Sequence, residues 1–202
     1  MSKLSLLQPD KSYTFRSYFE MPYEADEILQ EFGYTLIRQR LNLPQTSEVL
    51  EFLPSLHQRL EETLPFVSLS SETARREILV APVLLEVARH CHCQLRIEYP
   101  LVVNNWLRGN LDYLLHQEQR LLVIGAKNDD MTRGFTQLAV EMIAVAEAED
   151  QDILYGAVTM GDAWRFGKIE QQQKTITQDI ALYRVPDDLG DLVKILVGIV
   201  AS

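Results

Sequence analysis

The chain has 202 residues, of which 47% are hydrophobic and 24% are charged, and its formal net charge is −10 at pH 7. This length suits one sizeable domain with an extension, and the acidic charge disfavours a surface built mainly for phosphates. The apolar runs are shorter than the about 18–20 residues of a membrane span, and no secretory signal is recognised at the N-terminus. We therefore expect a cytoplasmic protein without a membrane partner.

Residues 1–67 are predicted to form an N-terminal extension of helices and loops. Glu24–Phe32 has apolar side chains at helical spacing, and Gly33 follows as a natural stop. A second helix is expected over Ser47–Thr63, where Pro54 would kink or split it. The apolar helices of this extension are candidates to cover a sheet or to mediate a homodimer.

Residues 68–202 are predicted to form one globular core. Its first helix can be capped by Ser70 or Ser71, and Glu72 lies in the first turn, where the helix dipole favours a carboxylate. Pro82 removes one backbone donor from this helix. We therefore expect a bend about one turn before Pro82.

Four potential metal ligands stand in a row from His90 to Cys93. The spacing is wrong for one tetrahedral zinc site, because structural zinc sites use two separated ligand pairs. The simpler interpretation is a helix end, with His90 near the last carbonyls and the two cysteines as small buried side chains. Zinc stays the alternative.

After this helix the hydrophobic period becomes strand-like. Leu95–Leu101 alternates apolar and polar residues, which is typical of a strand with one solvated face. Gly109–His116 and Leu121–Lys127 are predicted as the strands of a short hairpin whose tip is near Glu118. The second strand is apolar on both faces, so we expect it to be central in the sheet.

The rest of the core alternates helices and strands. An amphipathic helix follows the hairpin, with an apolar stripe from Phe135 to Ala146 and Thr132 as its expected cap. Three strands and a last helix are expected at Ile153–Thr159, Ala163–Ile169, Thr175–Arg184 and Leu189–Val200. This order predicts an α+β fold with an α/β-type three-layer core, in which helices flank a mixed β-sheet.

The predicted hairpin brings candidate chemistry together. With its tip near Glu118, Asp112 faces residue 124 or 125, and Lys127 projects from the same strand face as Gly125. Two carboxylates placed across such a hairpin hold Mg²⁺ as hard oxygen ligands. A lysine two residues further on positions the attacking water and stabilises developing negative charge.

Three segments in this order resemble the motifs of the PD-(D/E)XK nuclease superfamily: Gly109–Leu115, Leu121–Asn128 and Thr136–Met142. The helix of Ser71–Arg76 is similar to the first core helix of that superfamily. The chain also resembles small cyanobacterial members that carry an N-terminal extension. The resemblance implies a restriction-endonuclease-like fold, Mg²⁺ or Mn²⁺ as cofactor, and DNA as the substrate of a phosphodiesterase.

The resemblance also implies roles for single residues. Asp112 matches the metal-binding aspartate, Lys127 the catalytic lysine, and Gln137 the helix glutamine that follows the lysine strand. Glu72 matches an accessory helix glutamate that faces the metal. The main-chain carbonyl of Ala126 would be a further metal ligand.

Gly125 departs from the motif, because the superfamily has Glu or Asp at this position. Losing one of two carboxylates should weaken Mg²⁺ binding sharply, since this ion gives up its water reluctantly. A migrated acid would compensate for the loss. Glu72 is the first candidate, Asp129 and Asp130 follow Lys127 closely, and Glu141 would approach if its side of the helix faces the groove.

Three hypotheses remain open from the sequence. The first is a metal-dependent DNA phosphodiesterase, favoured by Asp112, Lys127 and Gln137. The second is a non-catalytic module that binds nucleic acid or protein on the same fold, favoured by Gly125 and the acidic charge. The third is that Gly125 is a sporadic change in an active protein. On the first hypothesis, Gly125→Glu is expected to create or raise activity.

Overall fold

The structure is a computed structural model that describes residues 5–117, 120–127 and 130–201. Its strands are β1 Thr35–Gln39, β2 Gln94–Val102, β3 Arg108–Gln117, β4 Arg120–Ala126, β5 Ile153–Thr159, β6 Ala163–Glu170, β7 Thr175–Asp179 and β8 Tyr183–Arg184. Its helical segments are α1 Phe15–Glu20, α2 Ala25–Glu31, α3 Leu53–Thr63, η1 Leu64–Phe66, α4 Glu72–Arg75, η2 Arg76–Val80, α5 Ala81–Cys91, α6 Met131–Ala148 and α7 Leu189–Ala201. The expected mixture of helices with a mixed sheet is confirmed.

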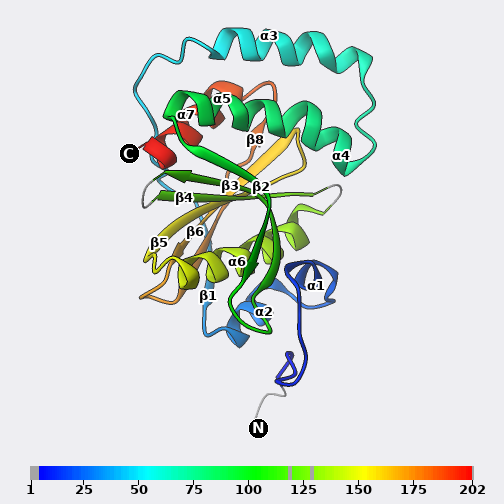
Figure 1. Ribbon diagram of the computed structural model, residues 1–202, viewed down its shortest axis with the longest axis vertical. Helices are drawn as coiled ribbons and strands as arrows, with labels where there is room; N and C mark the ends of the chain where they lie inside the picture. The colour runs from blue at the N-terminus through cyan, green and yellow to red at the C-terminus, as the bar shows by residue number, and fades with distance from the viewer. Residues whose placement is uncertain (1–4, 118–119, 128–129, 202) are drawn as a thin grey trace.

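The strands form one sheet in the order β1-β7-β6-β5-β4-β3-β2, with β8 paired to β6 (Figure 1). Pairing of β4 with β5 and of β1 with β7 is parallel, whereas the other pairs are antiparallel. The central strand β4 is buried from Leu121 to Ala126, as its apolar sequence predicted.

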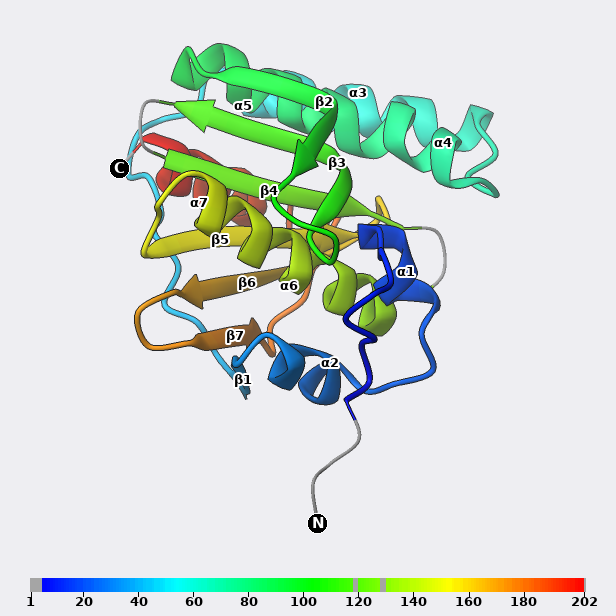
Figure 2. The same cartoon turned by 60° about the horizontal axis from the view of Figure 1, so that its bottom comes forward.

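Helices cover both faces of the sheet. On one face α3, α5 and α7 contribute to a hydrophobic cluster with side chains such as Tyr113, Ile124 and Phe166. On the other face α1, α2 and α6 pack with side chains such as Val123 and Val158 (Figure 2). Every residue of α6 from Gly134 to Ala146 is buried. This helix is therefore held firmly against the centre of the sheet.

The predicted hairpin is confirmed to within one residue at each strand end. The β3–β4 pairs run from Gln117↔Arg120 to Tyr113↔Ile124. The expected tip at Glu118 lies outside the described residues. One further step of the same register sets Asp112 opposite Gly125.

The first 67 residues hold more than the expected helices and loops. Thr35–Gln39 adds a parallel edge strand beside β7, so this part of the chain extends the main sheet. Most side chains of β1 are exposed, and an edge strand with so little burial lacks the apolar alternation that marks a strand. The expected helix at Ser47–Thr63 was too long. It begins at Leu53, because Pro54 suits a first turn, where its missing N–H is not needed.

The core differs from the sequence-based prediction in three local details. At the place of the expected bend a π-helical turn, η2, precedes α5, and Pro82 lies in the first turn of α5. Asp130 rather than Thr132 caps α6, because the Asp130 Oδ1 accepts a 2.9 Å hydrogen bond from the Arg133 N–H. The expected strand Thr175–Arg184 is divided into β7 and β8.

The His90–Cys93 run is a helix end, as the simpler interpretation held, but only one of its two cysteines is buried, because Cys93 is partly exposed. Helix α5 ends at Cys91, which is buried, and His92 follows in the left-handed conformation with φ of 52°. No helix in the described ranges combines the length and the apolar character needed to cross a membrane.

Candidate functional site

Asp112 and Lys127 meet across the hairpin, as predicted. The Lys127 Nζ donates a 3.1 Å hydrogen bond to the Asp112 Oδ2, and the Ala126 N–H donates a 2.8 Å bond to the same oxygen. The backbone N–H of Lys127 in turn donates to the Thr159 carbonyl on β5 at 2.7 Å. The central strands therefore hold the lysine and the carboxylate in a defined geometry.

Arg76 approaches Asp112 from the other side. Its Nη1 lies 3.8 Å from the Asp112 Oδ1 and 2.7 Å from the Glu98 Oε1. Its guanidinium also lies over the Tyr113 ring, 5.1 Å from the centroid. Burial alone would lower the pKa of Arg76, but hydrogen bonds from Arg76 to Tyr113 and Glu98 and the charge of Asp112 raise it. Arg76 is therefore a fixed cation of the site.

Glu141 on α6 is a fully buried carboxylate. Its Oε1 accepts a 2.7 Å hydrogen bond from the Gln137 Nε2. Among the described residues its Oε2 has no hydrogen-bond partner. Burial raises the pKa of Glu141 to about 8, with Lys127 lowering it and Asp112 raising it. A buried oxygen without a partner is costly, so it calls for an explanation.

The unpartnered oxygen points to the place where the motif lacks its acid. A Cβ atom built on Gly125 would lie 3.8 Å from the Glu141 Oε2, with no other described heavy atom outside the chain neighbours within 4 Å. Extending the β3–β4 register by one residue beyond the pair of Tyr113 and Ile124 also sets Gly125 opposite Asp112. The carboxylate of Glu141 thus reaches the space that a side chain at position 125 would enter.

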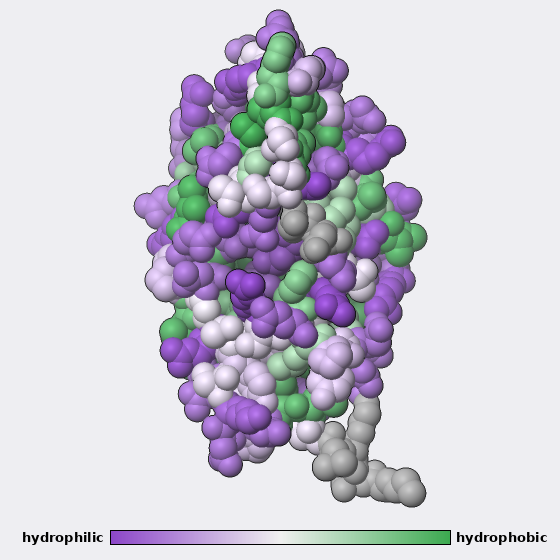
Figure 3. All heavy atoms as spheres, turned by 90° about the vertical axis from the view of Figure 1, so that its right-hand side faces the viewer, coloured by the Kyte–Doolittle hydropathy of each residue, from purple (hydrophilic) through white to green (hydrophobic). Residues whose placement is uncertain are grey.

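A cavity of about 620 Å³ opens beside the Asp112–Lys127 pair, and the buried Glu141 lies behind its lining residue Gln137. Four residues predicted from the sequence line it together, namely Asp112, Lys127, Gln137 and Glu72. Arg76 and Glu98 line it as well, and so do residues of α1 and its N-cap. Figure 3 shows the side of the molecule with α1 and the end of α4, where hydrophilic residues gather across the middle of the face.

The other predicted acids lie in different settings. Glu72, the first candidate for a migrated acid, borders the cavity, whereas Asp130 is used as the cap of α6. Asp129 lies outside the described residues. Among the acids that the structure describes, Glu141 comes nearest the position of residue 125. Its spacing of one helical turn from Gln137 was the available signal, because residues four apart share a helix face.

Two carboxylates are a plausible donor set for a small hard cation. No group of three or more His, Cys, Asp or Glu side chains within residues 5–117, 120–127 and 130–201 is arranged to hold a metal ion. Mg²⁺ is often bound by one or two carboxylates together with water and substrate phosphates. The unpartnered Oε2 of Glu141 and the carboxylate of Asp112 fit that pattern.

The fold and the site define a mixed α+β protein with a carboxylate–lysine centre at the floor of a cavity. Comparisons with protein-family models, with curated proteins and with solved structures found no match. The geometry of the site is therefore what bears on the function.

Proposed function

We propose that this chain is a metal-dependent phosphodiesterase of the PD-(D/E)XK type, with a restriction-endonuclease-like core, that acts on DNA. In this proposal Glu141 replaces the acid expected at position 125. The observation that carries it is the distance of 3.8 Å between the Glu141 Oε2 and a Cβ atom built on Gly125, next to the Asp112–Lys127 pair.

Each residue of the site has a distinct task in this proposal. Asp112 and Glu141 would hold Mg²⁺ or Mn²⁺, and the bound cation would offset the negative charge of the phosphate. Lys127 would donate from its Nζ to a phosphate oxygen or to the attacking water. Gln137 would keep Glu141 in place through its 2.7 Å hydrogen bond. The carbonyl of Ala126 and the carboxylate of Glu72 stay candidates for further ligands.

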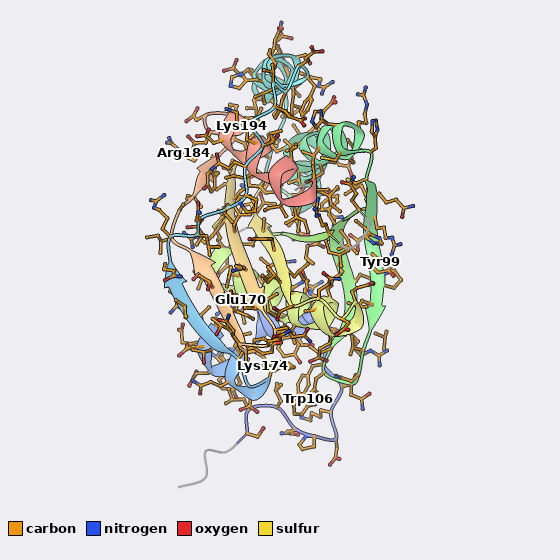
Figure 4. The ribbon with its side chains drawn as sticks, turned by 90° about the vertical axis from the view of Figure 1, so that its left-hand side faces the viewer. Tyr99, Trp106, Glu170, Lys174, Arg184 and Lys194 are labelled. Atoms are coloured by element: carbon orange, nitrogen blue, oxygen red, sulfur yellow. The ribbon has the colours of Figure 1, made fainter. Side chains whose placement is uncertain are left out.

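The test is a cleavage assay with labelled single-stranded and double-stranded DNA in Mg²⁺, in Mn²⁺ and in EDTA. The wild-type chain is expected to cleave only with metal, and Asp112→Asn, Glu141→Gln and Lys127→Met are expected to lose activity. The matched control pair is Lys168→Met and Glu170→Gln. These residues form a half-buried ion pair of 2.9 Å and do not line the cavity, and Glu170 is labelled in Figure 4.

A carboxylate swap tests the central claim. Glu141→Ala should abolish metal-dependent cleavage, and the double variant Gly125→Glu/Glu141→Ala should restore part of it by returning the acid to β4. A folded double variant that cleaves no better than Glu141→Ala would count against the replacement. Absence of cleavage by the wild-type chain and by the swap, across all DNA forms and both metals, would overturn the proposal.

A second candidate is a non-catalytic module on the same fold that binds nucleic acid or protein. It is favoured by the state of Asp112, whose Oδ2 already accepts bonds from the Ala126 N–H and the Lys127 Nζ. The negative charge of this carboxylate is therefore offset by Lys127 and does not require a metal ion. Binding of DNA that is the same in EDTA and in Mg²⁺, together with no cleavage, would favour this candidate.

A further inference from the structure

Helix α1 forms one wall of the cavity, although it belongs to the N-terminal part of the chain. Phe15, Arg16 and Phe19 line the cavity together with Asp112 and Lys127. In Figure 2, α1 lies beside the ends of β3 and β4 and near α6. Asp112 and Lys127 therefore share one space with a helix from outside the motif-bearing core.

Two contacts hold α1 in this position. A Cβ atom on Gly109 would lie 2.8 Å from the Phe15 Cδ2, so α1 packs directly on the backbone of β3 at a glycine with φ of +145°. Tyr18 is buried, and its hydroxyl donates a 2.7 Å hydrogen bond to the carbonyl of Trp106. Trp106 lies in the β2–β3 connection (Figure 4). Helix α1 is thus a fixed part of the wall.

Arg16 is the basic side chain of the cavity that is most open to an incoming anion. The side chains of Lys127 and Arg76 are 10% and 18% exposed and form ion pairs with carboxylates of the site. The Arg16 side chain is 83% exposed, and its ion pair with Glu20 joins two surface groups one helical turn apart. An ion pair between two exposed groups contributes little to stability, so a phosphate can displace it readily.

Phe19 adds an aromatic surface beside this cation. It is half-buried, lines the same cavity and follows Arg16 by three residues, which places both on one side of the helix. An aromatic ring for the base and a cation for the phosphate are the combination by which proteins bind single-stranded nucleic acid. The volume of about 620 Å³ is in the range of small-ligand sites, which suits an unpaired nucleotide rather than a duplex.

We propose that α1 is the nucleotide-binding wall of this site, with Phe19 stacking on a base and Arg16 binding the neighbouring phosphate of single-stranded or unpaired DNA. The choice of DNA as the ligand rests on the proposed function. The substrate class follows from the shape and the chemistry of the wall: unpaired ends, loops or extruded nucleotides enter, and a regular duplex does not.

Binding of a fluorescein-labelled single-stranded oligonucleotide to the full chain, followed by anisotropy in EDTA and in Ca²⁺, tests this proposal separately from cleavage. Phe19→Ala is expected to weaken binding about tenfold, since stacking on an aromatic residue contributes that much per base. Phe19→Leu, which keeps apolar volume for folding, should lose affinity as well, whereas Phe19→Trp should keep it. Arg16→Gln should reduce the slope of log affinity against log salt by about 0.7, the value for one phosphate contact.

The matched controls are exposed residues away from the cavity. Arg89 is 78% exposed and pairs with Glu86 on its own helix, as Arg16 pairs with Glu20, and Phe66 is 88% exposed. Arg89→Gln and Phe66→Ala should leave binding unchanged. Unchanged affinity in folded Arg16→Gln and Phe19→Leu, or a duplex bound as tightly as the single strand, would overturn the inference. If the inference is overturned in this way but the wild type still cleaves DNA, the proposed function stands. If binding depends on Phe19 and Arg16 but no cleavage is observed, the inference is supported and only the nuclease activity is rejected.

Discussion

The Glu141 Oε2 ends 3.8 Å from the position that a Cβ atom of residue 125 would occupy, although the two residues belong to a helix and to a strand. Both α6 and β4 are buried, so this relationship is set by the packing of the core. The missing side chain at Gly125 and the Glu141 Oε2, which has no hydrogen-bond partner among the described residues, are therefore complementary.

Gly125→Ala should be tolerated. The new methyl group would make only an ordinary van der Waals contact with the Glu141 Oε2 at 3.8 Å. Replacing a glycine inside a strand should raise the free energy of unfolding by about 0.5–1 kcal/mol. Urea denaturation monitored by circular dichroism measures this change. A loss of stability instead would show that the space beside Glu141 has to stay free of carbon atoms.

Gly125→Glu alone should lower the free energy of unfolding of the chain. The added carboxylate would enter the buried space next to Glu141, and an uncompensated buried charge costs about 3–5 kcal/mol. Gly125→Gln has a similar shape without the charge and should cost less. Equal losses in the two variants, measured by denaturation at pH 9, would point to a steric cause instead.

The stability of the metal-free chain should carry a pH signature of Glu141. Burial raises the pKa of this carboxyl from 4.5 to about 8. Between these two values the unfolded chain releases the proton and the folded chain keeps it, so the free energy of unfolding falls as pH rises and levels off above about 8. Glu141→Gln should remove this part of the pH dependence. Denaturation curves of both proteins at several pH values give the difference directly, and parallel profiles would contradict the raised pKa.

Mn²⁺ or Mg²⁺ should raise the melting temperature through Asp112 and Glu141. A ligand present at 100 times its dissociation constant stabilises the folded state by about 2.7 kcal/mol. Thermal scans with increasing metal should show this shift in the wild type and lose it in Asp112→Asn and Glu141→Gln. Glu170→Gln is the control and should keep the shift. A shift that is the same in all four proteins would mean that the metal binds elsewhere.

Local patterns in the sequence were sufficient for much of the fold. Ile153–Thr159 is a strand at the predicted bounds, and the last helix begins at Leu189 as expected. Alternation and helical spacing report which side of an element is buried, so elements with a clear buried side were found. Helix α1 and strand β1 were missed, because the helix has only six residues and β1 is a mostly exposed edge strand.

For the site, the sequence by itself determined what lies within one hairpin. The tip near Glu118 implied that Asp112 faces residue 124 or 125 and that Lys127 shares the strand face of Gly125, because residues equally distant from a hairpin tip lie opposite each other. The structural register selects position 125. Only the tertiary structure decided which groups from other elements complete the site. Glu141 reaches position 125 because α6 docks across β4, and Arg16 and Phe19 reach the cavity because α1 packs on Gly109. These contacts join parts of the chain that are distant in sequence. The periodicity of apolar residues within one element does not predict which other element packs against it.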